Sequence, residues 1–318
     1  MENLPNDWDI LQKGLNASIL QSKVWADVQE AMGRKPHFEW SNHWSWVGFE
    51  RKSRGIKYLF VPYGPTASLK GDEALKSVVD FARKQGFDFV RIEPKGNFNA
   101  QDLKSIGAIK IGEVEPEHTQ IIDLSLSEEE LRSDLNSGHR NRINGAQKRG
   151  IELSITNSKE DFESFLKMLR DTAKRAKVTF YPDSYYKDIY KIMEPSGTAK
   201  LYMTKVEGQP VAAALFYDYN GMRYYSHSGA FQDLNRKYNA TVYLLWQAML
   251  DAKKMGLNAI DLWGVAPNDD PKHKWAGISA FKKGYGGKTV SFMGTYDMPI
   301  KKSKYKIYSM MQKVRGRG

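Results

Sequence analysis

The chain has 318 residues, of which 41% are hydrophobic and 12% aromatic, so it can bury a substantial core in one large or two ordinary domains. It contains no cysteine, which excludes disulfides, a thiolate nucleophile and a sulfur-ligated zinc site. The formal net charge of +11 predicts attraction to a polyanion such as nucleic acid, a phospholipid surface or a phosphate-bearing substrate.

The hydropathy pattern contains neither a membrane span nor a targeting signal. The longest apolar stretch, residues 211–217, is far shorter than the roughly 20 residues that cross a bilayer. Residues 1–16 lack the basic start and the apolar run of a signal peptide. We therefore expect a soluble protein of the cytoplasm.

The first half of the sequence predicts interleaved helices and strands. Helices are expected over residues 21–32 and 72–85, and strands over residues 38–51, 57–62, 89–93, 108–112 and 119–124. In the second helix Leu75, Val78, Val79 and Ala82 form one apolar stripe, and Gly86 supplies the left-handed stop before the next strand. The result is a helix that leads directly into a buried strand.

The second half repeats this plan. A helix capped by Ser127 and Glu130 is expected to run to Gly150 and to join two domains. Another helix follows Ser158, and strands are expected over residues 200–205, 211–217, 223–228 and 260–263. A helix with a stripe at positions 242, 245, 249 and 252 then leads through Gly256 into the last of these strands, as in the first half. The fold class is therefore α/β, and the order of elements is that of the GNAT (acyl-CoA N-acyltransferase) plan.

Several common chemistries are excluded by spacing. Residues 284–288 lack the leading glycine of a phosphate-binding P-loop, and no Gly-x-Ser-x-Gly nucleophile motif is present. The six histidines are not spaced as metal ligands on one helix, so no metal site is expected. The stretch at 236–241, where a GNAT enzyme has a glycine-rich turn for coenzyme A, carries side chains at both glycine positions. This stretch argues against coenzyme A.

Residues 138–151 carry a more specific pattern, Gly-His-Arg-Asn-Arg-Ile-Asn-Gly-Ala-Gln-Lys-Arg-Gly-Ile. The run resembles the Arg-Asn-Arg-Ile-Asn-x-Ala-x-Lys-x-Gly-Val signature of the FemABX family. Further similar motifs follow the order of that family at residues 21–25, 62–65, 116–124, 172–175, 208–214, 224–226, 261–264 and 281–286. The chain thus resembles FemABX proteins over nearly its whole length.

This resemblance implies two GNAT-like domains with mixed sheets flanked by helices. The first would comprise residues 1–125 and 296–318 and bind the precursor, and the second, residues 126–295, would take the aminoacyl-tRNA. Only residues 207–210 separate two expected strands, which leaves no room for the coiled-coil arm of some members. The implied function is transfer of an amino acid from aminoacyl-tRNA to the stem-peptide amine of lipid II or UDP-MurNAc-pentapeptide, by a monomer without a further cofactor.

The resemblance also assigns roles to individual residues. Lys282 would stabilise the oxyanion, and the main chain of neighbouring Phe281 would line the site. Arg175 would bind a phosphate of the precursor, although the family's tyrosine four residues later is Thr179 here. Glu93 follows a buried strand and is a candidate general base, with a salt bridge at the sheet edge as the alternative.

The remaining site residues are less sharply defined. Tyr224 and Tyr225 point to opposite faces of a strand, and Tyr225 is preferred as the substrate contact. A cation near the start would grip the precursor, but the sequence does not distinguish Lys23, Arg34 and Lys35. The signature helix supplies three residues that are expected to bind tRNA, namely Arg140, Asn141 and Arg142.

Two other functions stay open at this point. One is an N-acyltransferase that uses a coenzyme A thioester, and the other is a basic protein that binds RNA or a membrane surface without catalysis. The last eighteen residues carry seven cations and no acid, which suits either a solvated helix face or contact with the inner face of the membrane. The cations are Lys301, Lys302, Lys304, Lys306, Lys313, Arg315 and Arg317.

Overall fold

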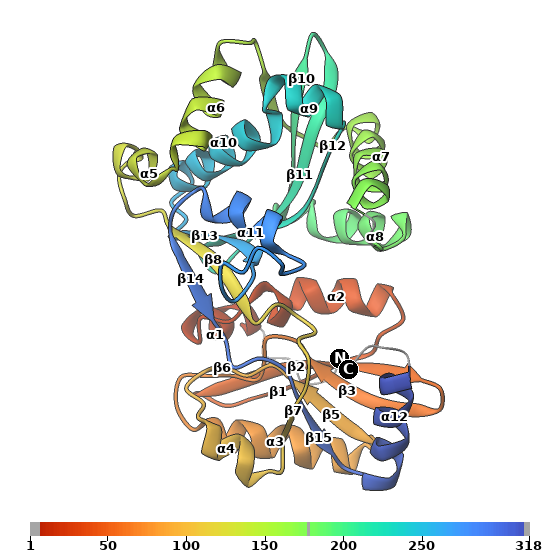
Figure 1. Ribbon diagram of the computed structural model, residues 1–318. Coiled ribbons are helices and arrows are strands. Elements are labelled where there is room, and N and C mark those ends of the chain that lie inside the picture. Colours follow the sequence, from red (N-terminus) through yellow and green to blue (C-terminus); the bar gives the residue numbers. More distant parts are fainter. Residues whose placement is uncertain (1–6, 177–178, 315–318) are drawn as a thin grey trace. The chain divides into compact units, whose positions relative to one another are not determined.

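The computed structural model describes residues 7–176 and 179–314, without the side chains of residues 147, 313 and 314. The chain divides into two compact units (Figure 1). Unit 1 comprises residues 1–117 and 292–318, and unit 2 comprises residues 118–291. The predicted first boundary, residue 125, differs from this division because the strand at 118–123 is hydrogen-bonded into the sheet of unit 2. Arg315 and Arg317 of the cationic tail lie outside the described residues.

Unit 1 holds one mixed sheet in the order β6-β4-β2-β3-β5-β15-β7, with β1 paired to β2. Strands β3 and β5 are parallel neighbours joined by α3, whose predicted stripe is fully buried on the sheet. The described elements of unit 1 are α1 (Trp8–Gly14), the 3-10 helix η1 (Ile19–Gln21), α2 (Lys23–Ala31), β1 (Pro36–Trp40), β2 (Trp44–Ser53), β3 (Ile56–Val61), β4 (Thr66–Ala67), α3 (Gly71–Lys84), β5 (Phe89–Ile92), β6 (Lys95–Gly96), α4 (Ala100–Ser105), β7 (Ile109–Lys110), β15 (Tyr296–Pro299) and α12 (Lys302–Val314).

Helix α12 is held against the rest of unit 1 by aromatic packing and by ion pairs. Tyr308 packs on Phe89 of β5, with ring centroids 4.8 Å apart. On the same helix Lys304 forms an ion pair with the buried carboxylate of Asp88, and Lys301, which precedes the helix, bonds to the same carboxylate. These two lysines therefore hold the C-terminal helix in place, so only part of the cationic tail is available for an external partner.

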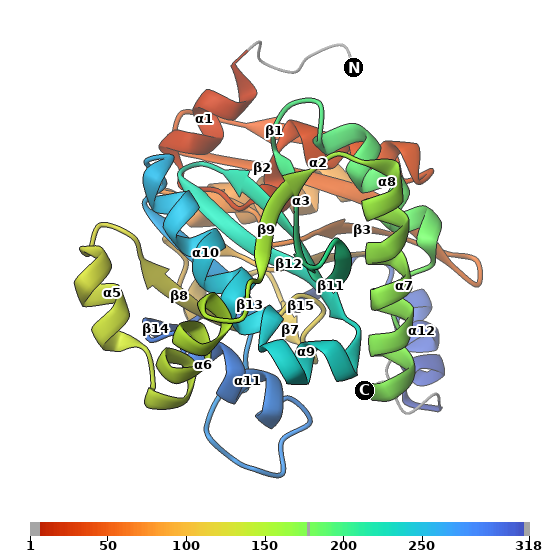
Figure 2. The ribbon, with the colours of Figure 1, turned by 90° about the horizontal axis from the view of Figure 1, so that it is seen from above.

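Unit 2 holds a second mixed sheet in the order β14-β8-β13-β12-β11-β10-β9. Helices α6 and α10 lie on one face of this sheet, and α7 and α8 lie on the other (Figures 1 and 2). The described elements are β8 (His118–Asp123), α5 (Glu128–Asp134), α6 (Ser137–Gln147), β9 (Glu152–Thr156), α7 (Lys159–Ala176), α8 (Asp183–Met193), β10 (Ala199–Val206), β11 (Gln209–Tyr219), β12 (Met222–Ala230), α9 (Gln232–Tyr238), α10 (Ala240–Lys254), β13 (Ala259–Gly264), α11 (Ala276–Lys283) and β14 (Lys288–Ser291).

Two connections in unit 2 bear on the sequence predictions. Strand β10 ends at Val206 and β11 begins at Gln209, so a tight two-residue turn stands where an arm would be inserted, as predicted. The single helix expected over residues 127–150 is wrong, because the chain breaks it into α5 and α6. Leu135 is buried in an extended conformation, and the side chain of Asn136 caps α6 by accepting from the amide of His139.

Candidate functional site

The central parallel pair of unit 2, β12 and β13, comes apart part-way along its length. Their ladder runs through three residue pairs and ends at Tyr224 and Asp261, although β12 continues to Ala230 and β13 to Gly264. A shift in register with β8 marks the same part of β13. In the GNAT plan the acyl donor enters between such diverging strands, so this splay is the natural centre of a candidate site.

The end of β13 is held in an unusual conformation by a buried carboxylate. Trp263 has a φ of +64°, a region that residues with a Cβ rarely adopt. Asp261 is 5% exposed and accepts from the amide of Trp263 at 2.7 Å and from the hydroxyl of Thr119 on β8. The carboxylate thus stabilises the bend that carries β13 away from β12.

Lys282 of α11 reaches this bend from the following helix. Its Nζ donates to the carbonyl oxygen of Gly264 at 2.7 Å, and the side chain is only 8% exposed. Burial lowers the pKa of Lys282 to about 8, while the charge of Asp261 acts in the opposite direction. A cation with a depressed pKa, in a largely dry place beside the splay, is suited to stabilise an oxyanion.

Helix α11 is fastened to the start of α6 by two main-chain contacts. The Nε2 of His139 donates to the carbonyl oxygen of Phe281 at 3.0 Å, and the amide of Asn136 donates to that of Gly284 at 2.9 Å. A Cβ at Gly284 would approach His139 to 2.6 Å, so this close contact requires glycine. The signature run and the 281–286 motif are therefore parts of one joint that positions Lys282.

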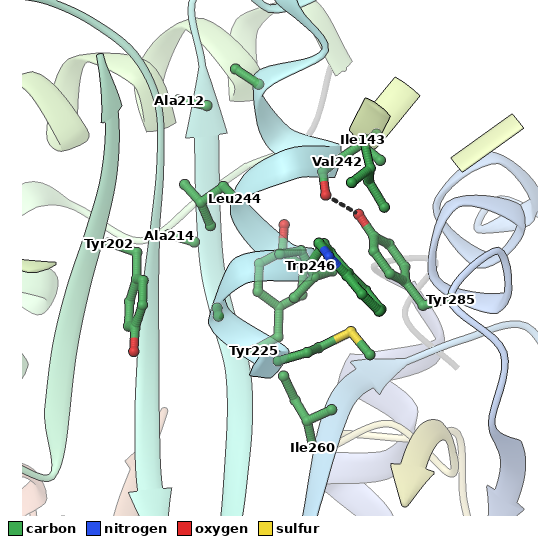
Figure 3. Packing of buried hydrophobic residues seen from close by; sticks show 14 of the residues in the cluster. Ile143, Tyr202, Ala212, Ala214, Tyr225, Val242, Leu244, Trp246, Ile260 and Tyr285 are labelled. Atoms are coloured by element: carbon green, nitrogen blue, oxygen red, sulfur yellow. Dashed lines mark hydrogen bonds between the residues drawn. The ribbon is translucent and has the colours of Figure 1, made fainter. Parts of the chain in front are cut away.

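The two adjacent tyrosines of β12 lie on opposite faces of the sheet. Tyr225 is in the apolar core against α10 (Figure 3). Its hydroxyl donates to Ser228 at 2.6 Å. Burial raises the pKa of Tyr225 to about 12. Tyr224 faces the other way and packs edge-on against Trp263 at 5.7 Å between ring centroids. The geometry thus favours Tyr224 over the preferred Tyr225 as a residue of the splay.

The junction between α9 and α10 differs from a pyrophosphate-binding turn. Asn239, with a φ of +57°, links the two helices directly. The side chain of Asn235 accepts from the amide of Thr241 at 2.9 Å and from its hydroxyl at 3.0 Å. An amide at the start of α10 is therefore already satisfied within the chain.

Arg175 lies near the end of α7, beside the start of α9. Its side chain is exposed, with a long contact of 3.5 Å to the hydroxyl of Thr172. A shallow pocket at this place is lined by Asp171, Lys174, Arg175, Phe231, Gln232, Asp233 and Leu234. The guanidinium is therefore accessible to an anion that binds in this pocket, between the end of α7 and the start of α9.

Glu93 belongs to unit 1 and is engaged by three donors. Its carboxylate accepts from the amides of Tyr63 at 3.1 Å and Glu115 at 2.8 Å, and from the hydroxyl of Thr295 at 2.8 Å. These partners come from the turn after β3 and from the two segments that precede and follow unit 2 in the chain. Burial raises the pKa of Glu93, and burial together with the Glu93 charge raises the pKa of Glu115 to about 8. The Glu93 carboxylate thus links three separate segments of unit 1 through hydrogen bonds.

The three candidate cations near the N-terminus have different surroundings. Lys23 forms an ion pair with Asp27 on α2, and Arg34 donates to the side chain of Gln29 at 2.7 Å. Lys35 is exposed, and its side chain makes no ion pair among the described residues. Lys35 is therefore the most available of the three.

The three residues expected to bind tRNA lie on α6 and are exposed. Arg140 donates to the carbonyl oxygen of Leu135 at 3.0 Å, which ties it to the break between α5 and α6. Asn141 and Arg142 face solvent. Of all the predicted site residues, the structure brings Phe281 and Lys282 together beside the splay, with α6 attached through His139.

Sequence reasoning missed His139, Asp261 and Asn235 as residues of this region. His139 and Asp261 could have been found, because both lie inside motifs that resemble FemABX proteins. Asn235 lies outside those motifs, so nothing in the sequence pointed to it. Among residues 7–176 and 179–314, no group of three or more His, Asp or Glu side chains is arranged to hold a metal ion. Within the same ranges, no helix has both the length and the apolar character to cross a membrane.

Comparison with known proteins decides the family. The model of the FemAB family matches residues 107–207 and 194–313, which together span more than half of the chain. The chain belongs to the FemAB family. The lipid II:glycine glycyltransferase of Staphylococcus epidermidis is 23% identical over 226 residues, which cover 62% of this chain and 53% of that protein. The chain thus spans about half the length of the curated relatives it matches.

Solved structures confirm the predicted fold class. The crystal structure of FemX superimposes with a TM-score of 0.85 at 16% identity and covers 96% of this FemAB chain and 98% of its own. A tandem GNAT protein from the clavulanic acid biosynthesis pathway has a TM-score of 0.52 at 11% identity, over 92% of this chain and 96% of that chain. The fold is therefore mixed α/β with two GNAT-like units.

Proposed function

We propose that this FemAB-family protein transfers an amino acid from aminoacyl-tRNA to the stem-peptide amine of a peptidoglycan precursor, and so builds an interpeptide bridge. The observation that carries the proposal is the splay of β12 and β13 with buried Lys282 at its edge. Support for the acceptor comes from the similar staphylococcal protein, which is named a lipid II:glycine glycyltransferase. The acceptor is accordingly lipid II or its soluble counterpart, UDP-MurNAc-pentapeptide.

The chemistry requires little beyond positioning and charge stabilisation. The acceptor amine, in its neutral form, attacks the ester carbonyl carbon and forms a tetrahedral oxyanion, which collapses with expulsion of the terminal ribose oxygen of the tRNA. The proton lost by the amine ends on that oxygen. Lys282, as an ammonium, stabilises the oxyanion, and the main chain of Phe281 lines the same place. The proposed reaction uses no metal and no further cofactor.

The junction between α9 and α10 favours tRNA over coenzyme A as the donor. The Asn235 side chain already occupies the amide of Thr241, and Asn239 and Thr241 fill the positions where glycines would admit a pyrophosphate. An N-acyltransferase that takes a coenzyme A thioester is thus the weaker alternative. It predicts that coenzyme A binds and supports transfer, whereas the tRNA proposal predicts neither.

Precursor and tRNA contacts are assigned to residues that the structure leaves accessible. Arg175 binds a precursor phosphate through its exposed guanidinium. Tyr224 is buried, and it takes the role first given to Tyr225 because its ring packs on Trp263 at the splay. In unit 1, Lys35 is a better precursor contact than Lys23, which is paired with Asp27. Glu93 is a structural residue in this proposal, because its carboxylate is held by three donors.

Membrane association is proposed as a weak, peripheral contact of a cytoplasmic monomer. Lys302 and Lys306 are exposed on α12, and Ile307 and Met310 of the same helix are 54% and 57% exposed. Each basic residue near an anionic bilayer contributes about 1 kcal/mol. Binding to phosphatidylglycerol vesicles should fall in Lys302→Gln/Lys306→Gln, and unchanged binding would remove this part of the proposal. Lys301 and Lys304 are left intact because they hold α12 to Asp88.

The test of the activity is mass spectrometry of the precursor after incubation with the protein and a mixed pool of aminoacylated tRNA. The expected product is a precursor one amino-acid residue heavier, whose mass identifies the amino acid. Ribonuclease treatment of the pool should abolish the product. Parallel reactions with lipid II and with UDP-MurNAc-pentapeptide distinguish the two acceptors, and absence of product from both would overturn the proposal.

A further inference from the structure

Four exposed cations gather where α6, α9 and α10 meet in unit 2. Lys148 and Arg149 follow the last turn of α6, and Arg236 and Lys237 belong to the last turn of α9. The Nη1 of Arg149 donates to the carbonyl oxygen of Lys237 at 2.5 Å, which joins segments 88 residues apart in the chain. Figure 2 shows α6 and α9 on either side of the start of α10. We call these four residues the junction patch.

The charges of the junction patch are not neutralised by acids. Among the described residues of the chain, none of the four forms an ion pair, whereas the half-buried Lys200 in the same unit is paired with Asp218 at 3.0 Å. The Nζ of Lys237 lies 4.9 Å from the centroid of the Tyr238 ring, and Glu207 in the β10–β11 turn adds a weaker attraction without forming an ion pair. Clustered cations without counter-charges repel one another and create a positive potential that favours an anionic partner. The patch is therefore a candidate surface for a polyanion.

The position of the junction patch narrows the choice of partner. It surrounds the start of α10, which is the place where a GNAT enzyme holds the pyrophosphate of its donor by main-chain amides. Here the Thr241 amide is satisfied by Asn235, so side chains are left to provide the anion contacts. Flexible cations spread over two helix ends suit successive phosphates along a strand better than one compact pyrophosphate.

We propose that the junction patch binds the phosphodiester backbone of the donor RNA. This inference rests on the proposed function, because it assigns the docking surface of the tRNA that the transfer reaction requires. It extends the tRNA contact from Arg140, Asn141 and Arg142 along α6 to its C-terminal end and onto α9. Phosphate contacts of this kind position the RNA without reading its sequence.

The test compares two triple variants that lower the net charge equally. The patch variant is Lys148→Gln/Arg236→Gln/Lys237→Gln, which leaves the contact of Arg149 with the Lys237 carbonyl in place. The control is Lys76→Gln/Lys84→Gln/Lys104→Gln, which removes three exposed cations of unit 1 that form no ion pair with the described part of the chain. Equal circular dichroism and melting temperature establish that both variants fold like the parent.

The measurement is the equilibrium binding of fluorescently labelled deacylated tRNA as a function of salt concentration. Each lost phosphate contact reduces the slope of log K against log salt by about 1, so the patch variant should lose about 2 to 3 units of slope and at least about tenfold in affinity at low salt. The control should keep the slope and the affinity of the parent. Coenzyme A, used as a competitor, should not displace the tRNA.

The outcomes separate the inference from the proposed function. Parent-like binding by the patch variant overturns the junction patch but leaves the transfer reaction standing. Displacement of tRNA by coenzyme A assigns the patch to a compact pyrophosphate and also overturns it. A parent protein that binds no tRNA at all removes the proposed donor and the patch together.

Discussion

Units 1 and 2 use one supersecondary plan and differ in how far its central strands stay paired. In each unit a helix, α3 or α10, joins two parallel neighbouring strands through a left-handed glycine, Gly86 or Gly256. In unit 1 all four residues of β5 pair with β3, whereas in unit 2 only the first three of the six residues of β13 pair with β12. The same local pattern therefore yields a closed pair in one unit and an open pair in the other.

Acidic side chains at the ends of these strands have opposite effects. Glu93, directly after β5, draws the turn at Tyr63 and the segments at Glu115 and Thr295 onto the sheet of unit 1. Asp261, inside β13, stabilises the bend at Trp263 that opens the pair in unit 2. The buried carboxylate of unit 1 holds separate segments together, whereas the buried carboxylate of unit 2 keeps two central strands apart.

The largest effect is expected from Lys282→Ala, which removes the cation at the open pair. An oxyanion exists only in the transition state, so single-turnover transfer should fall about 10²- to 10³-fold while precursor affinity changes little. Arg175→Ala should do the reverse and weaken precursor binding by about 1.5 to 3 kcal/mol, because a phosphate is charged before and during the reaction. Normal single-turnover transfer by folded Lys282→Ala would remove it as the oxyanion group.

A smaller effect is expected from His139→Ala, which removes one of the two contacts between α11 and α6 without changing a residue of the splay. Loss of the contact with the Phe281 carbonyl should displace Lys282 and slow transfer about 10- to 100-fold. Burial lowers the pKa of Lys282 to about 8, and the acceptor amine must be neutral while Lys282 is charged, so the rise of parent activity with pH should level off near pH 8. In the variant this levelling-off should move to higher pH as water reaches Lys282, and His139→Gln should restore the parent profile. A rate loss with an unmoved pH profile would mean that His139 does not position Lys282.

In unit 1, Glu93→Gln should affect stability and leave the chemistry unchanged. The amide cannot accept from all three donors, so the free energy of unfolding should fall by about 1 to 3 kcal/mol, measured by urea denaturation. Single-turnover transfer and its pH profile should match the parent under conditions where the variant is folded. A large rate loss with an altered pH profile would restore Glu93 as a general base.

The smallest effect is a pH dependence of stability that originates at Glu115. Its pKa is raised to about 8 in the folded protein, so between its ordinary pKa and pH 8 the folded chain holds a proton that the unfolded chain has lost. Stability should therefore fall as the pH rises through this range. Glu115→Gln should flatten the dependence in urea denaturation from pH 5 to 8.5, and an unchanged slope would contradict the raised pKa.

The spacing of apolar residues predicted the helix-to-strand units that both halves share, because an apolar stripe followed by a glycine depends only on local sequence. The stripes of α3 and α10 are buried as expected. The break at Leu135 was missed because it is imposed by burial and by the Asn136 cap on a sequence that continues to favour helix. Alternation placed Tyr224 and Tyr225 on opposite faces, but only the packing of α10 decides which face is the core.

The chemical character of the site depended on contacts that the sequence does not encode locally. The motif identified Lys282, but its depressed pKa comes from burial beside the Gly264 carbonyl. His139 acts on a carbonyl 142 residues away, which no spacing rule could reveal. Glu93 was chosen because it follows a buried strand, and its three donors became visible only when separate segments met.

The most direct test of the account offers the protein the same amino acid on two carriers. Single-turnover transfer to the precursor is measured once from the aminoacyl-tRNA and once from the corresponding aminoacyl-coenzyme A thioester with ribonuclease present. The account predicts transfer from the tRNA ester alone, because the Thr241 amide at the α9–α10 junction, where a pyrophosphate would bind, is already occupied by Asn235. Comparable transfer from the coenzyme A thioester would contradict it.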